Sequence, residues 1–194
     1  MQKIISLFKR DYEGNRQVYD EIVEGAEWVQ EGEGVATVKW DGTACMFRGG
    51  KLFKRYDRKM KHGKYRDAPD GWEAAQEPDA VTGHWPGWVP LVNDNPADRW
   101  HLEAWGHISS SGIHDGTYEL IGPKVQGNPH FWRGHELLPH GLPILADFPR
   151  TFDDIKSEFE KSNSTVIEGV VWHHPDRRMV KIKRKDFGLL WPVK

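Results

Sequence analysis

The chain has 194 residues, with 27 Lys and Arg against 29 Asp and Glu, and 38% of its residues are apolar. This apolar content is enough to bury a core and disfavours disordered, collagen-like and coiled-coil classes. The net charge of −2 gives no chain-wide nucleic-acid signature, so a polyanion site must be a local patch. The single cysteine, Cys45, excludes an intramolecular disulfide framework. No apolar run approaches the roughly 20 residues of a membrane helix. We expect one domain over residues 1–194, without a membrane segment, in a reducing cytoplasmic compartment.

The first predicted elements lie before residue 56. Apolar residues at near-helical spacing predict a short amphipathic helix over 16–24. β-branched residues from 35 to 40 predict a strand. Segments 45–48 and 52–55 flank the turn dipeptide Gly49-Gly50, which predicts a hairpin.

The middle of the chain is rich in Gly, Pro, Asp and His. From 60 to 95 this composition predicts a long surface segment, with a helical turn near 72–76. Its isolated tryptophans are expected to pin loops to the core. Residues 100–105 and 117–121 are predicted to be strands.

The last third of the chain predicts a helix and a hairpin. Thr151 is a suitable N-cap for a helix over 151–161 with an apolar face. Segments 166–172 and 179–185 predict the two strands of a hairpin. The expected fold class is therefore α+β, with mostly antiparallel sheets flanked by a few helices.

Lys39 stands at the end of a predicted strand, two residues before Asp41 and next to the turn at Gly42. This position lets a lysine lean into a cleft. Lysine is a nucleophile only in its neutral form, which burial or nearby positive charge favours. The alternative is an edge-strand lysine before an ordinary turn.

Lys181 and Lys183 alternate with Val180 and Ile182 on a predicted strand, so the lysines share one face and the apolar residues face the core. Two ammonium groups about 7 Å apart suit a phosphate chain. The alternative is a solvated strand face or a charged sheet edge.

Glu168 and Glu119 each lie within an otherwise apolar strand. A buried carboxylate needs a partner. Mg²⁺ is bound by one or two carboxylates together with phosphate oxygens and water, which suits Glu168. Glu119 is suited to accept hydrogen bonds from a ribose hydroxyl. The alternatives are a half-buried salt bridge to a neighbouring lysine for Glu168, and a structural ion pair for Glu119.

The order of these residues resembles the covalent nucleotidyltransferase superfamily of ATP-dependent ligases and mRNA capping enzymes. Within it, the chain is most similar to the eukaryotic-type ATP-dependent 5′-to-3′ RNA ligase family, RNA ligase 1. The similarity runs from about residue 35 to residue 192. The matching motifs are Lys39-Trp40-Asp41-Gly42-Thr43, Arg55-Tyr56-Asp57-Arg58-Lys59, Pro86-Gly87-Trp88-Val89-Pro90, Glu119-Leu120-Ile121-Gly122, Gly127-Asn128-Pro129, Pro139-His140-Gly141, Glu168-Gly169-Val170-Val171-Trp172-His173 and Gly188-Leu189-Leu190-Trp191-Pro192.

The resemblance implies a nucleotidyltransferase (adenylation) domain that seals RNA in three steps. Lys39 attacks the α-phosphorus of ATP, which releases pyrophosphate and leaves a lysyl-AMP. The AMP then passes to an RNA 5′-phosphate, and a 3′-hydroxyl displaces it. The implied cofactors are ATP and Mg²⁺, with Mn²⁺ as a substitute. The implied partner is RNA with 5′-phosphate and 3′-hydroxyl ends, bound by a monomer.

The resemblance also implies roles for single residues. Lys181 and Lys183 hold the α-phosphate, Glu168 positions Mg²⁺, and Asp41 helps to hold the metal and its water. Nucleotide contacts are implied for Val38, whose backbone region selects adenine, and for Asp41, Gly42, Arg55 and Glu119. Arg55 contacts the nucleotide or the 5′-phosphate, and Glu119 the ribose. Candidates for stacking on adenine are Leu138 and His140.

Two departures from the wider superfamily affect this interpretation. Many relatives carry an arginine at the position of Ala44, and its absence favours the RNA ligase branch. The chain ends eleven residues after Lys183, so we expect no C-terminal OB-fold or accessory domain. RNA would then be engaged by the domain itself, through the basic stretch Lys51 to Lys64, unless that stretch is a solvated loop.

Two other functions stay open. The first is a nucleotidyltransferase that adenylates RNA 5′ ends or another acceptor without sealing. The second is a catalytically inactive module that binds nucleotide or RNA. The presence of Lys39, Glu168, Lys181 and Lys183 disfavours the inactive module, because degeneration usually removes such groups first.

Overall fold

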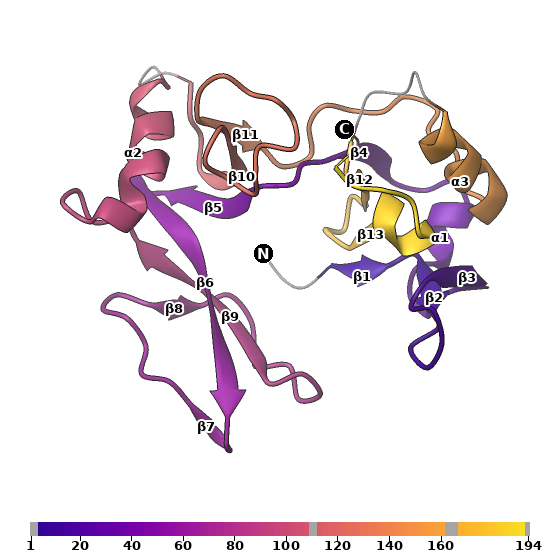
Figure 1. Cartoon of the computed structure of the whole chain (residues 1–194), viewed down its shortest axis with the longest axis horizontal. Coiled ribbons are helices and arrows are strands. Elements are labelled where there is room, and N and C mark those ends of the chain that lie inside the picture. Colours follow the sequence, from indigo (N-terminus) through magenta and orange to yellow (C-terminus); the bar gives the residue numbers. More distant parts are fainter. Residues whose placement is uncertain (1–3, 109–111, 162–166, 193–194) are drawn as a thin grey trace. The chain divides into compact units, whose positions relative to one another are not determined.

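The computed structural model describes residues 4–108, 112–161 and 167–192. The chain forms two compact units: unit 1 covers Gly42–His140, and unit 2 covers Lys3–Asp41 and Gly141–Lys194. The chain thus passes into unit 1 after Asp41 and returns to unit 2 after His140. Each unit has its own sheet, and most of the strand pairing is antiparallel with few helices, as the expected α+β class requires (Figure 1).

The described part of unit 2 contains a four-stranded sheet in the order β1-β13-β12-β4. The strands are β1 (Ile5–Ser6), β4 (Val35–Lys39), β12 (Gly169–His173) and β13 (Met179–Lys183). β1 runs parallel to β13, and the other pairs are antiparallel. The predicted strand at 35–40 and the predicted hairpin near the C-terminus are confirmed, although residue 166 of that hairpin lies outside the described residues.

A second, two-stranded sheet in unit 2 replaces the helix predicted over 16–24. It pairs β2 (Phe8–Arg10) with β3 (Val18–Ile22). Val18 and Ile22 are four residues apart, a spacing that fits one face of a strand as well as one face of a helix. Because these residues pair with β2, the segment forms a strand, and the helix prediction was wrong.

The helices of unit 2 pack against the apolar face of its larger sheet. They are α1 (Glu27–Gln30), α3 (Phe152–Glu160) and the 3₁₀ helix η2 (Arg184–Phe187). α3 confirms its prediction: the Thr151 hydroxyl accepts a hydrogen bond from the Asp154 amide, and Ile155 and Phe159 are buried. The core of the unit includes Phe8, Phe159, Trp172 and Ile182.

The described part of unit 1 is built on a seven-stranded sheet in the order β11-β10-β5-β6-β9-β8, with β7 paired to β6. Its strands are β5 (Thr43–Arg48), β6 (Lys51–Lys61), β7 (Lys64–Tyr65), β8 (Glu73–Ala74), β9 (His84–Pro90), β10 (Gly116–Ile121) and β11 (Glu136–Pro139). The β5–β6 hairpin and the strand at 117–121 are confirmed. Gly49 and Gly50 both have positive φ, which the tight turn requires.

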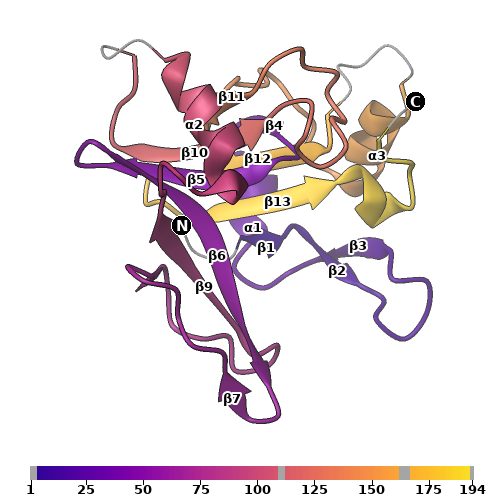
Figure 2. The same cartoon turned by 60° about the vertical axis from the view of Figure 1, so that its left-hand side comes forward.

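The predicted surface segment from 60 to 95 is in part a sheet. β6 and β9 lie side by side, with pairing from Phe53–Pro90 to Lys59–His84 (Figure 2). The helical turn expected near 72–76 is the short strand β8 instead, because Glu73 and Ala74 pair with β9. The indoles of Trp72 and Trp85 donate to backbone carbonyls, as expected for residues that pin loops.

The strand predicted at 100–105 was also wrong, since these residues belong to α2 (Arg99–Gly106), which follows the 3₁₀ helix η1 (Pro96–Asp98). Asn95 caps the start of η1 by accepting from the Ala97 amide, and Pro96 follows it. An Asn-Pro pair of this kind is a helix-start signal. His101 and Ala104 form the buried face of α2 over the core of unit 1.

Candidate active site

Three residues of unit 2 are aligned across the strands of its larger sheet. Gly169 on β12 pairs with Lys39 on β4 on one side and with Lys183 on β13 on the other. Residues aligned in this way project from the same face of a sheet. Lys181 pairs with Val171, two residues further along each strand and on the same face. Val180 and Ile182 are fully buried. The predicted division of β13 into a lysine face and an apolar face is therefore confirmed.

Glu168 connects the two ends of this row. Its carboxylate forms an ion pair with the ammonium group of Lys39, and its second oxygen lies 3.8 Å from Nζ of Lys183. The Glu168 side chain is only 10% exposed. The salt bridge considered as an alternative for Glu168 is thus present. It brings the proposed nucleophile, a carboxylate and a β13 lysine together.

Burial raises the pKa of the Glu168 carboxyl, and contact with Lys39 opposes that shift. The negative charge of Asp41 raises the pKa of Glu168 further, so the two carboxylates lie within electrostatic range of each other. Burial also lowers the pKa of Lys181, and the positive charges of Lys39 and Lys183 add to this decrease. The cluster therefore concentrates positive charge around one partly buried carboxylate.

Asp41 is oriented by a residue to which the sequence analysis assigned no role. The indole nitrogen of Trp191 donates to Oδ2 of Asp41 at 2.7 Å. Trp191 lies in the last of the matching motifs and is 7% exposed. A Trp close to the C-terminus and far in sequence from Asp41 offers no local signal of this contact.

The carboxylates of Asp41 and Glu168 fit a Mg²⁺ ion that takes one or two protein oxygens and completes its shell with phosphate and water. The negative charge of Asp41 raises the pKa of the Glu168 carboxyl, and a bound cation would relieve this repulsion. Over residues 4–108, 112–161 and 167–192, no three His, Cys, Asp or Glu side chains gather as a metal-binding group. A protein-only metal cage is therefore absent from the described chain, and a site shared with phosphate is the kind that these residues can form.

Val38 lies in the same strand as Lys39 but is 5% exposed. Its backbone amide donates to the carbonyl of Pro143 at 3.1 Å, and the Thr37 hydroxyl donates to the carbonyl of Val171. These backbone and side-chain groups serve packing in the structure, and the adenine contact expected near Val38 stays a prediction.

In unit 1, Glu119 on β10 is held from two sides. Its Oε1 accepts from the amide of Gly42 at 3.1 Å, and its Oε2 lies 2.8 Å from Nε2 of His140. Leu138 on β11 and Ala44 on β5 are paired with Glu119 across the sheet. The structure thus brings Gly42, Glu119 and both candidate stacking residues together, and the Glu119–His140 contact is a hydrogen bond in this arrangement.

Arg55 lies on β6, the strand next to β5, in unit 1. Its Nε donates to Oδ1 of Asp57 at 2.7 Å, and its guanidinium lies 5.1 Å from the ring centre of Trp88. These contacts fix a side chain that is 19% exposed. Ala44 lies on β5, the strand between β10 and β6, and pairs with Glu119.

Most of the basic stretch from Lys51 to Lys64 lies on β6, and its last residue, Lys64, lies on β7. Lys54 forms an ion pair with Asp98, which is fully buried. Lys59 and Lys61 are exposed, whereas Lys54 is only partly exposed beside the buried Asp98. In the described chain, no helix is long and apolar enough to cross a membrane.

The α+β fold carries a cluster in which two lysines contact one carboxylate, and cationic groups of this kind suit a phosphorylated ligand. Comparison with known proteins is consistent with such a ligand. The model of the family described as RNA ligase 1 matches residues 104–194, a range that includes Glu119, Glu168, Lys181 and Lys183. The chain is 30% identical to RNA ligase 1 of Danio rerio over 81% of its own length and 68% of the relative's length.

Mammalian relatives give similar values. RNA ligase 1 of Pongo abelii is 28% identical over 82% of this chain and 69% of its own length. RNA ligase 1 of Rattus norvegicus is 28% identical over the same shares. The chain belongs to the RNA ligase 1 family.

Proposed function

We propose that this protein is an ATP- and Mg²⁺-dependent RNA ligase with a nucleotidyltransferase fold, which joins 5′-phosphate and 3′-hydroxyl ends through a lysyl-AMP. The observation that carries the proposal is the row Lys39–Gly169–Lys183 with Glu168 beside it, in a member of the RNA ligase 1 family. A nucleophilic amine needs such surroundings, because cations next to it stabilise the negative charge that gathers on phosphorus.

In the first step, Nζ of Lys39 forms a bond with the α-phosphorus of ATP while the bond to the bridging oxygen breaks. Attack needs the neutral amine, so the ammonium proton passes to solvent water before the new bond forms, and pyrophosphate leaves with the electron pair of the broken bond. Lys181 and Lys183 are the residues that contact the α-phosphate. Asp41 and Glu168 would hold Mg²⁺, which neutralises charge on phosphate oxygens when bound.

The next two steps transfer AMP to the RNA 5′-phosphate and then release it as the 3′-hydroxyl attacks. The exposed lysines of β6 support binding of the RNA backbone. The ribose contact of Glu119 and the nucleotide or 5′-phosphate contact of Arg55 stay predictions.

The test is product analysis after incubation of the protein with ATP, Mg²⁺ and 5′-phosphorylated RNA, either nicked or single-stranded. The proposal expects joined strands, which are lost when Lys39 is replaced by Arg, a substitution that keeps the charge. Adenylated RNA that accumulates without joined strands would favour the non-sealing nucleotidyltransferase. Binding of RNA or nucleotide without any covalent product would favour the inactive module.

A further inference from the structure

Phe131 differs from the other phenylalanines of the chain in its exposure to solvent. It lies in the loop that connects β10 to β11 in unit 1 and is 72% exposed, whereas the other phenylalanines are buried or half-buried. Moving an aromatic ring from water into an apolar surrounding is favourable, so an exposed ring forgoes this gain. None of the motifs shared with the family includes Phe131.

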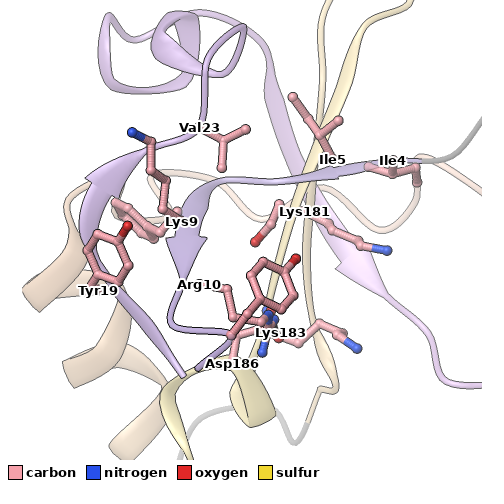
Figure 3. Close-up of a pocket in the computed structure, with 12 residues that line it drawn as sticks. Ile4, Ile5, Lys9, Arg10, Tyr19, Val23, Lys181, Lys183 and Asp186 are labelled. Atoms are coloured by element: carbon pink, nitrogen blue, oxygen red, sulfur yellow. Dashed lines mark hydrogen bonds and ion pairs between the residues drawn. The ribbon is translucent and has the colours of Figure 1, made fainter. Parts of the chain in front are cut away.

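Two tyrosines of unit 2 are also exposed, but for a different reason. Tyr12 and Tyr19 line a pocket of about 480 Å³ that Lys181 and Lys183 also line. Figure 3 shows Tyr19 on the same side of this pocket as Lys9. A tyrosine carries a hydroxyl group that water can solvate, which accounts for its exposure. The side chain of Phe131 has no polar atom, so its exposure needs another cause.

The backbone of Phe131 is also in an unfavourable conformation. Its φ is 55°, in the left-handed region, which a bulky residue rarely adopts because Cβ approaches the following carbonyl oxygen. Asn and Gly adopt this conformation at a lower cost. Exposure and backbone conformation thus both disfavour a phenylalanine at this position. A residue that persists under such strain is typical of a functional site.

Hydrogen bonds to Asn128 hold Phe131 in this conformation. The Asn128 carbonyl accepts from the Phe131 amide at 3.1 Å. The Asn128 side chain accepts from the amide of Trp132 and donates to the carbonyl of Trp132, each at 2.9 Å. Val125 lies in the core of unit 1, and Pro129 is buried, so both attach the loop to the unit. The loop therefore presents the ring to solvent in a fixed orientation, which lowers the entropy lost when a ligand binds.

The charges around Phe131 in the sequence favour a polyanion. Residues 120–135 contain no Asp or Glu, although the chain has 29 of them. Arg133 follows Phe131 by two residues and is exposed. Single-stranded nucleic acid is bound by such combinations, in which a base stacks on the aromatic ring and a cation contacts the backbone.

The position of the loop indicates which base it meets. The loop joins β10, which carries Glu119, to β11, where Leu138 is paired with Glu119. Nε2 of Gln126 in the loop donates to the Gly42 carbonyl at 3.4 Å, and the Gly42 amide donates to Glu119. In the proposed function Glu119 contacts the ribose of AMP. After AMP transfer, two shared phosphates join this AMP directly to the 5′-terminal nucleotide of the RNA, so that nucleotide is the one that reaches the loop.

We propose that the ring of Phe131 stacks on the 5′-terminal base of the RNA and that Arg133 contacts the backbone beside it. This inference rests on the proposed function and adds an RNA-positioning residue to it. Stacking does not depend on the identity of the base, because every base has a π-face.

The test measures binding of 5′-phosphorylated single-stranded RNA, labelled with a fluorophore at its 3′ end, by fluorescence anisotropy without ATP. The whole chain is compared with Phe131→Asn and Phe131→Trp. The dissociation constant should rise about tenfold in Phe131→Asn, as expected for one lost stack of a base on an aromatic ring. Phe131→Trp should bind RNA at least as tightly as wild type, because it keeps a ring face.

RNA that lacks the base of its 5′-terminal nucleotide identifies the stacking partner. Wild type should bind this RNA about tenfold more weakly than the intact RNA. Phe131→Asn should then cause no further loss, because the partner of the ring is already missing. A loss in Phe131→Asn that persists in full on the abasic RNA would overturn the inference.

The matched control is Val92→Asn. Val92 is also apolar and exposed in unit 1, at 56%, but lies outside the loop. It should bind RNA like wild type. Thermal melts add a second criterion: Phe131→Asn should melt no lower than wild type, since Asn tolerates positive φ. A Phe131→Asn protein that melts lower and binds RNA as tightly as Val92→Asn would assign the ring to packing and overturn the inference.

These binding measurements need no covalent chemistry, so they separate this inference from the proposed function. An RNA affinity that depends on the ring supports the stacking residue even if no lysyl-AMP forms. Unchanged affinity in Phe131→Asn, in a protein that does form lysyl-AMP, refutes the stacking residue and leaves the ligase proposal intact. The inference is also overturned if Phe131→Asn binds RNA normally but needs more ATP for adenylation, because the ring then contacts the adenine of ATP.

Discussion

At the scale of single residues, the cluster around Glu168 carries opposing electrostatic effects. Burial raises the pKa of Glu168 and lowers the pKa of Lys181, so each group is less stable in its charged form than in water. The ion pair with Lys39 lowers the pKa of Glu168 but offsets only part of the increase that burial causes. A cluster that is unfavourable for folding yet suited to phosphate chemistry is typical of a functional site.

Replacing Lys181 with Met should therefore separate stability from activity. The pKa of Lys181 in the folded protein lies below its ordinary value of 10.5. The fold is therefore more stable above pH 10.5, where Lys181 is neutral. This stability is lost as the pH falls through the pKa of the folded state and Lys181 becomes charged. At pH 7 the variant should melt higher, by on the order of 2–4 °C, the shift that about 1 kcal/mol produces in a chain of this size. Adenylation should fall by about 100-fold or more.

Thermal melts at pH 7 and near pH 10, with Lys161→Met as the exposed control, check this prediction. The gain in melting temperature should shrink as the pH approaches 10.5, and the control should show no gain. A Lys181→Met protein that melts lower than wild type at pH 7 would contradict the account.

Trp191 is expected to act as a positioning residue through Asp41. Trp191→Phe keeps the buried ring but removes the donor that holds Oδ2 of Asp41. Hydrogen bonds to charged groups contribute about 1.5–3 kcal/mol, so adenylation should slow about tenfold or more. The half-saturating Mg²⁺ concentration should also rise, a change that loss of packing alone would not produce.

The measurement is a Mg²⁺ titration of the adenylation rate for wild type and Trp191→Phe at matched folded fractions. Trp40→Phe, which removes the indole donor to the Leu142 carbonyl, is the matched control. An unchanged Mg²⁺ dependence in Trp191→Phe would remove Trp191 from this role.

At the scale of elements, local signals predicted some segments well. Thr151 with two following aspartates marks the start of α3, and Gly49-Gly50 marks the β5–β6 turn, because both depend on neighbours within a few residues. β3 could not be predicted in this way, because its conformation depends on pairing with β2. The segment before α2 does carry a local signal, the Asn95-Pro96 pair, which caps η1.

In the candidate site, too, only the features that local geometry fixes could be predicted from the sequence. The alternation of Lys181 and Lys183 with buried residues could be predicted, because strand geometry fixes it. The contacts Trp191–Asp41 and His140–Glu119 could not, since they join residues far apart in sequence whose side chains meet only after folding. The same holds for the ion pair that joins Arg10 to Asp186 in η2.

Gly169 is expected to be indispensable to the sheet of unit 2. A Cβ at this position would lie 2.2 Å from the carbonyl oxygen of Ile182 and 2.8 Å from Cα of Lys183. Gly169→Ala must therefore push β12 and β13 apart and disturb the pairing with both Lys39 and Lys183. We expect a loss of stability of about 1–3 kcal/mol, together with loss of adenylation.

Chemical denaturation and an adenylation assay check this prediction. Gly134→Ala is the control, because a Cβ there meets no atom within 4 Å. If Gly169→Ala is as stable and active as Gly134→Ala, the close approach of the two strands is not required.

At the scale of the whole molecule, the small net charge places RNA binding on local surfaces. The half of β6 beyond its pairing with β5 carries the exposed residues Lys59 and Lys61. The double variant Lys59→Gln/Lys61→Gln should weaken RNA binding regardless of sequence. It should also flatten the dependence of log K on log salt by about 0.7–0.9 per lysine that contacts phosphate.

Binding titrations over a range of salt concentrations provide the measurement, and Lys124→Gln, an exposed lysine elsewhere in unit 1, is the control. Salt slopes that are identical in wild type and the double variant would place the RNA backbone elsewhere.

The central claim concerns the covalent chemistry of Lys39, and the most direct measurement is labelling with α-³²P-ATP or α-³²P-GTP and Mg²⁺. Denaturing gels and intact mass report the adduct, and Lys39→Ala is run beside wild type that is shown to carry no AMP beforehand. We predict an AMP adduct on the wild-type protein and none on the variant. Absence of an adduct with either nucleotide, or an adduct that persists in Lys39→Ala, would contradict the account.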